Sequence, residues 1–174
     1  GFFYDTFFPF AAQTDGPFIL PAATLIRFFG VSPLVTQAVN LLYIGVLVLL
    51  LTALLKKLGL PLWAALAGVL MAVSVPGFSE FGMNAYGEIP ALVWFLAGLL
   101  AFGSAFGDQP SPGRAFLGGM FLALAYLTKV VALALVGPLV AIALLSALRG
   151  HVDRKSLVLL CAGFILPIVF WETF

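Results

Sequence analysis

The chain has 174 residues, of which 63% are hydrophobic and only 9% are charged. Soluble domains carry roughly a quarter of charged residues, so this composition excludes an ordinary soluble domain and predicts an all-α, polytopic transmembrane bundle. The net charge of +1 comes from scattered side chains, which argues against nucleic acid as a partner. One histidine and one cysteine cannot supply the ligands of a zinc site, and we predict no metal-ligand residues.

The first 30 residues do not form a span. Residues 1–16 are rich in aromatic side chains but are interrupted by Asp5, Pro9 and further helix breakers, which is typical of a loop outside the membrane. Residues 17–30 begin with proline and end with Gly30, a pattern that favours a short helix. This helix is too short to cross the hydrocarbon core, so we predict that it lies in the membrane interface.

About six apolar spans are predicted between residues 31 and 174. The segment 115–148 would form a single helix about 50 Å long, so we expect a hairpin that turns near Thr128 and Lys129. Glycine inside the spans favours close packing of helices, and loops are expected at 77–87 and 107–114. The predicted spans are 32–57, 61–76, 88–106, 115–128, 129–148 and 156–171.

The positive charges indicate an orientation. If the loop 1–16 is outside, only Arg27 and Lys129 of the eight basic residues fall outside, which agrees with the positive-inside rule. The six basic residues inside are Lys56, Lys57, Arg114, Arg149, Arg154 and Lys155. The same topology brings most acidic residues to the non-cytoplasmic face, namely Asp5, Asp15, Glu80, Glu88 and Glu172.

Glu88 and Asp5 each allow a structural and a functional interpretation. Glu88 stands at the start of a span, where a carboxylate complements the helix dipole. Alternatively, it orients a sugar hydroxyl or a metal at the membrane surface, and Pro90 fixes its direction by stiffening the helix start. Asp5 is either an exposed loop carboxylate or a general base that takes a proton from an attacking hydroxyl.

The remaining candidates also have two interpretations. Asp15 lies in the sequence "TDGP", which a turn explains. Lys129 and Arg27 are either interface residues that extend their charge toward water, or point charges that hold a phosphate. Cys161 lies within an apolar run and is expected to be a small buried side chain.

The order of three motifs resembles a known family. The stretch "TDGPFILPAATLIRFFG" is followed by "YGEIPAL" and then by "LTK". This order is similar to the N-terminal half of the GT-C membrane glycosyltransferases, in the group of protein O-mannosyltransferases and lipid A aminoarabinose transferases (families 39 and 83). The resemblance covers nearly all of residues 1–174, which we expect to be a partial GT-C-type transmembrane domain, truncated at both ends.

The resemblance implies an enzyme of the membrane, expected in a bacterial inner membrane with its site on the periplasmic or extracellular face. Such an enzyme moves a hexose or pentose from a polyprenyl-phosphate carrier to an acceptor lipid, glycan or protein. Family members carry an Asp-Glu pair after the first span, whereas Thr6 follows Asp5 here, so the alternative is a base upstream of Gly1. We predict Asp5 and Glu88 as catalytic residues and Asp15, Arg27, Tyr86 and Lys129 as substrate-binding residues. The need for a divalent metal stays open.

Two other classes of protein compete with this interpretation. A secondary transporter would place charges in the middle of spans and would show two related halves. Here the charges lie near span ends and no internal repeat is evident. A non-catalytic polytopic membrane protein is the third possibility.

Overall fold

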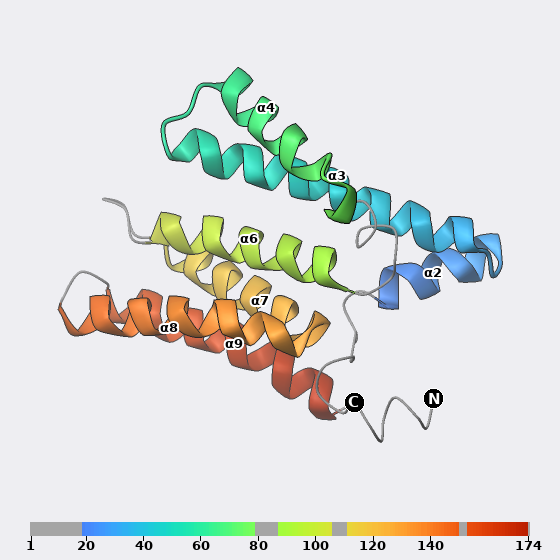
Figure 1. Ribbon diagram of the computed structural model, residues 1–174. Helices are drawn as coiled ribbons and strands as arrows, with labels where there is room; N and C mark the ends of the chain where they lie inside the picture. Colours follow the sequence, from blue (N-terminus) through green and yellow to red (C-terminus); the bar gives the residue numbers. More distant parts are fainter. Residues whose placement is uncertain (1–18, 79–86, 106–110, 150–152, 174) are drawn as a thin grey trace.

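The computed structural model describes residues 19–78, 87–105, 111–149 and 153–173. Within these ranges the chain is helical and contains no strand, as the composition predicts (Figure 1). The helices are α2 (Ile19–Phe29), α3 (Pro33–Lys57), α4 (Leu62–Val73), α6 (Glu88–Ala105), α7 (Pro112–Thr128), the short 3-10 helix η1 (Val130–Ala132), α8 (Leu133–Leu148) and α9 (Arg154–Thr173).

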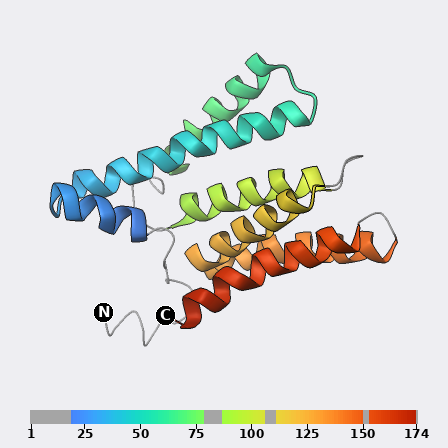
Figure 2. The same ribbon diagram turned by 180° about the vertical axis from the view of Figure 1, so that it is seen from behind.

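The long helices lie side by side, and helices that follow one another in the chain run in opposite directions (Figures 1 and 2). α6 packs against α3 and against α7, and α7 packs against α9. One end of the bundle therefore collects the C-termini of α3, α6 and α8 and the N-termini of α7 and α9, on the left in Figure 1. We call it the basic end, because it carries Lys56, Lys57, Arg114, Arg149, Arg154 and Lys155. The opposite end, where α6 begins, is called the Glu88 end.

The end of α2 and both ends of α3 lie within one residue of the predicted bounds. Gly30 adopts a φ of 81° directly after α2, a conformation that suits glycine at a helix C-terminus. The backbone N–H of Leu34 donates to the Oγ of Ser32 at 3.3 Å, so Ser32 caps the N-terminus of α3. Ala22 of α2 belongs to a buried cluster with α3 and α6, which holds α2 against the bundle.

The main core lies between α3 and α6. Tyr43 and Leu47 of α3 are buried against Ile89 and Val93 of α6, close to the Glu88 end. A largely apolar contact of this kind depends on close packing, because lipid offers the same side chains an equally apolar surrounding. This core fixes the position of the first turn of α6.

Aromatic rings connect the same core to α7. Trp94 meets Tyr43 edge to face, with ring centroids 6.2 Å apart. Trp94 also stacks on Phe121, with ring centroids 5.9 Å apart and an angle of 15° between the planes. Trp94 therefore reports on the packing of three helices, α3, α6 and α7.

Two glycines allow α7 and α9 to approach closely. A Cβ atom on Gly119 would overlap the carbonyl oxygen of Leu160, and one on Gly163 would overlap the carbonyl oxygen of Phe116. Both obstacles are backbone atoms, which cannot turn aside as a flexible side chain can. The α7–α9 contact is thus the small-residue packing that is common between helices in lipid.

Three of the described helices are long and apolar enough to cross a membrane: Pro33–Lys57, Val130–Leu148 and Arg154–Trp171. They match the first, fifth and sixth of the predicted spans. The other three predicted spans are helical but shorter, since α4 has 12 residues, α7 has 17, and the apolar stretch of α6 covers only Glu88–Gly103. At 1.5 Å per residue, α4 extends only about 18 Å, less than the roughly 30 Å of a hydrocarbon core. Their membrane crossing stays a prediction, as does the interfacial position of α2.

Several local expectations are corrected and one is confirmed. Residues 76–78 are helical, although a loop was expected from residue 77. Pro112 begins α7 instead of interrupting it, because proline is tolerated in the first turn of a helix. Cys161 is exposed rather than buried. The predicted turn near Thr128 and Lys129 is confirmed, since α7 ends at Thr128 and Lys129 is extended, with φ −157° and ψ 120°.

Candidate functional site

Glu88 lies in the first turn of α6. Gly87 before it has a φ of 77°, which favours glycine, and its carbonyl oxygen accepts the N–H of Ala91 at 3.0 Å. The carboxylate therefore sits at the positive end of the helix dipole. Its side chain is 47% exposed, so one part of it contacts protein and the other is open to the surroundings.

Lys129 lies where α7 gives way to η1. Its backbone N–H donates to the carbonyl oxygen of Ala125 at 3.1 Å and closes α7, while its own carbonyl oxygen accepts from Ala132 at 2.9 Å and opens η1. The preceding Thr128 is fully buried and donates its hydroxyl to the carbonyl oxygen of Leu124 at 2.7 Å. Lys129 thus stands at the negative end of the α7 dipole, and its side chain is only 13% exposed.

The two side chains form an ion pair in which the Nζ of Lys129 donates to the Oε1 of Glu88. The pair joins residues 41 positions apart in the chain. Ala91, Ala125 and Ala132 pack together as a separate buried cluster between α6, α7 and η1. Their small side chains let the three elements approach closely enough for the charged groups to meet. Glu88 and Lys129 thus lie at the same end of the bundle, as the predicted topology requires, whereas their chemical roles stay predictions.

A groove runs beside this ion pair, between α6, η1 and α8. It has a volume of about 570 Å³, and its only charged lining residues among those the structure describes are Glu88 and Lys129. The rest of its wall is apolar and includes Leu92, Val131 and Leu135. We call it the Glu88 groove. A charged pair next to an apolar wall suits a molecule with a polar head and a hydrocarbon tail.

Glu88 also borders a second groove, of about 670 Å³. Its remaining wall comes from the end of α4, from residues 75–78 and from α6, and includes Val75, Phe78 and Ile89. Glu88 therefore lines both grooves, which also share Leu92. The apolar residues of both grooves went unnoticed in the sequence, because alanine, valine and leucine there look like any other residues of a span.

Of the other predicted site residues, only Arg27 lies within the described ranges, and it is not part of this pair. Asp5, Asp15 and Tyr86 lie outside the described residues. Arg27 lies in the last turn of α2 and is exposed. Ala22, which packs α2 against the bundle, lies near the other end of that helix. Within the described ranges, His, Cys, Asp and Glu side chains form no group that could hold a metal ion.

Comparison with models of protein families, with curated proteins and with solved structures finds no match to this chain. The ion pair and its grooves are thus the observations on which a function can be argued.

Proposed function

We propose that this chain belongs to an integral-membrane glycosyltransferase of the GT-C type, which transfers a sugar from a polyprenyl-phosphate carrier to an acceptor hydroxyl. The observation that carries the proposal is the Glu88–Lys129 ion pair beside the apolar Glu88 groove. A polyprenyl-phosphate sugar has a negatively charged phosphodiester between a long apolar chain and a polar sugar. The groove offers an apolar wall for the chain and a cation for the phosphate.

In this proposal Lys129 holds the phosphate of the donor. A phosphodiester competes with the carboxylate of Glu88 for the same ammonium group, because both are anions. Donor binding therefore draws Lys129 toward the phosphate and releases Glu88, which can then accept a hydrogen bond from the acceptor hydroxyl. Glu88 acts as a positioning group in this scheme, and Asp5 keeps its predicted role as the base.

The reaction is a single displacement at the anomeric carbon. The acceptor oxygen attacks that carbon, its proton passes to a carboxylate, and the bond from the carbon to the phosphate oxygen breaks. The electron pair of that bond stays on the polyprenyl phosphate, where Lys129 stabilises the charge. The second groove beside Glu88 leaves room for the acceptor.

The proposal is tested by sugar transfer in membrane vesicles that contain the chain, with a panel of farnesyl-phosphate-linked hexoses and pentoses as donors. Lys129→Gln is expected to raise the KM for the donor, and Glu88→Gln to lower kcat. Lys57→Gln is the matched control, because it removes a basic residue from the opposite end of the bundle. Transfer that is equal in all four proteins, or absent in the unaltered chain with every donor, would contradict the proposal.

A non-catalytic membrane protein is the second candidate. It is favoured by the same ion pair, because each charge also complements the dipole of its own helix and neutralises the other without any ligand. In that case farnesyl phosphate would bind equally to the unaltered chain and to Lys129→Gln. A transporter is less well supported, since the described charges on the three long apolar helices lie near the helix ends and not at mid-span.

A further inference from the structure

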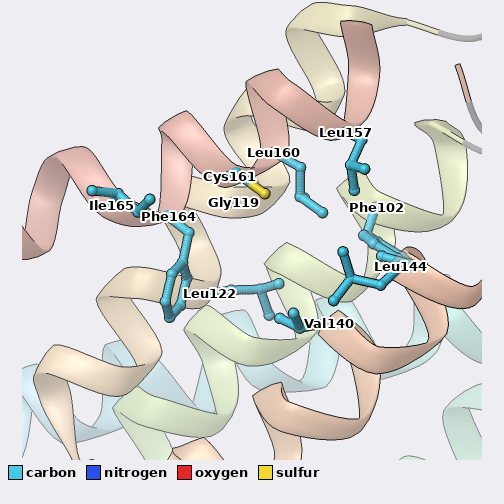
Figure 3. A pocket seen from close by; sticks show the side chains of 11 residues that line it. Phe102, Gly119, Leu122, Val140, Leu144, Leu157, Leu160, Cys161, Phe164 and Ile165 are labelled. Carbon is cyan, nitrogen blue, oxygen red and sulfur yellow. The ribbon is translucent and has the colours of Figure 1, made fainter. Parts of the chain in front are cut away.

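A separate apolar cavity lies toward the basic end, between α6, α7, α8 and α9 (Figure 3). Its volume is about 120 Å³, and none of the residues that line it is charged. The side chains of Leu122 and Val140 face those of Leu157 and Leu160 across it, and the sulfur of Cys161 lies at its edge. An apolar wall offers a water molecule none of the hydrogen-bond partners that it needs, whereas apolar molecules need none. Water is therefore a poor occupant, and hydrocarbon is a good one.

The cavity is open toward the outer surface of α8 and α9. Leu144 and Ile165 line it and are 46% and 54% exposed, and Cys161 is exposed as well. Two of the three segments that are long and apolar enough to cross a membrane border this opening: Val130–Leu148, which is η1 with α8, and Arg154–Trp171 of α9. In a membrane the molecules beside such helices are lipids, so an acyl chain is the hydrocarbon that reaches this opening.

Basic side chains stand directly beyond the cavity. Residues three or four positions apart share one face of a helix, and Arg154, Leu157 and Cys161 follow that spacing on α9. Arg154 therefore continues the cavity-lining face to the helix end, and it is exposed about 4.5 Å along the axis from Leu157. Arg149 directly follows α8 and is exposed about 7.5 Å along the axis beyond Leu144, but five residues from it and so not on the cavity-lining face.

The nearby acidic residue is already engaged. Asp153 precedes α9, and one of its carboxylate oxygens accepts the backbone N–H of Ser156 at 3.3 Å. This bond satisfies one of the N–H groups at the start of the helix, as an N-terminal cap does. Positive charge thus exceeds negative charge at this end of α8 and α9, where the structure describes one carboxylate and three basic residues, Arg149, Arg154 and Lys155.

We propose that the cavity is a binding site for a segment of one acyl chain of an anionic membrane phospholipid, whose headgroup phosphate is held by Arg154. The apolar wall takes the chain, and the glycerol region spans the short distance to the helix ends. Arginine binds phosphate oxygens through two parallel N–H donors, which gives a defined geometry. The site lies at the opposite end of the bundle from Glu88 and does not depend on the proposed glycosyltransferase function.

The test is native mass spectrometry of the detergent-purified chain, titrated with dioleoyl phosphatidylglycerol and, separately, with dioleoyl phosphatidylcholine. Each basic residue near an anionic headgroup contributes about fivefold in affinity. We expect phosphatidylglycerol to bind at least about fivefold more tightly than phosphatidylcholine. Arg154→Gln should remove about fivefold of the phosphatidylglycerol affinity and leave that for phosphatidylcholine unchanged.

Two further variants separate the cavity from general charge effects. Lys56→Gln, on α3 at the same basic end, removes an equal charge away from the cavity and should change neither affinity by as much as twofold. Ala143→Phe fills the cavity from α8 and should lower the affinity for both lipids. If Ala143→Phe fails to fold, Cys161→Phe fills the cavity from an exposed position and should have the same effect. Equal affinity for the two lipids, equal effects of Arg154→Gln and Lys56→Gln, or unchanged binding after the cavity is filled would each overturn the proposal.

Discussion

Removal of one partner of the Glu88–Lys129 ion pair is expected to have unequal effects on stability. Glu88→Gln leaves an ammonium group that is only 13% exposed without its carboxylate, whereas Lys129→Gln leaves a carboxylate that is 47% exposed. Breaking a fully buried pair costs about 3–5 kcal/mol, and exposed pairs contribute only about 0.2–1 kcal/mol. Because half of the pair is open to solvent, we expect about 2 kcal/mol for Glu88→Gln and about 1 kcal/mol for Lys129→Gln.

The measurement is a double-mutant cycle in mixed micelles, with unfolding by rising SDS followed through the fluorescence of Trp94. Trp94 contacts Tyr43 and Phe121, so its emission reports on the packing of α3, α6 and α7. The other two tryptophans are replaced by phenylalanine in every protein of the series. We expect a coupling free energy of about 1–2 kcal/mol between residues 88 and 129.

The control cycle pairs Glu88→Gln with Lys57→Gln, whose charge lies at the other end of the bundle. Their effects should add to within about 0.3–0.5 kcal/mol. The reasoning is refuted if residues 88 and 129 also add within that limit, or if Lys129→Gln proves the more destabilising change. The same proteins separate stability from chemistry, because a purely structural pair would lower sugar transfer only in proportion to the folded fraction.

Three glycine substitutions test the backbone geometry. Gly119→Ala is expected to destabilise the chain by about 1–3 kcal/mol in the same unfolding assay, because its Cβ would overlap the backbone of Leu160. Gly137→Ala places its Cβ in open space and should stabilise α8 by about 0.5–1 kcal/mol. Gly87→Ala forces a residue with a Cβ to adopt a φ of 77° and should cost about 1–2 kcal/mol; an unchanged midpoint would mean that the start of α6 relaxes freely.

Helix boundaries were the part of the fold that local sequence determined best. Ser32 and Gly30 have side-chain and backbone preferences that act within a few residues, so the end of α2 and the start of α3 could be predicted without tertiary contacts. The break at Lys129 was predictable from length alone. Pro112 was misjudged because proline both breaks and begins helices, and only its position relative to the first turn distinguishes the two.

Helix packing was less accessible to the sequence. Glycine in a span favours close approach, yet Gly45 and Gly137 have nothing within 4 Å of a Cβ, while Gly119 and Gly163 meet the backbone of a neighbouring helix. Which glycine lies in a contact depends on how each helix is rotated about its axis. An apolar span gives little information on that rotation, because its apolar residues surround it on all sides.

The contact between Glu88 and Lys129 follows from helix lengths. α6 and α7 are consecutive, antiparallel and nearly equal, at 18 and 17 residues, so each extends about 25–27 Å. The start of the first helix must then lie level with the end of the second, where Lys129 follows α7. The sequence thus predicts that the two charges share one end of the bundle.

Whether they touch depends on Ala91, Ala125 and Ala132, because larger residues at these positions would separate the elements that carry the charges. Ala125→Leu is therefore expected to abolish the coupling free energy between Glu88 and Lys129 while both charges remain present, and an undiminished coupling would show that the alanine cluster does not control their approach.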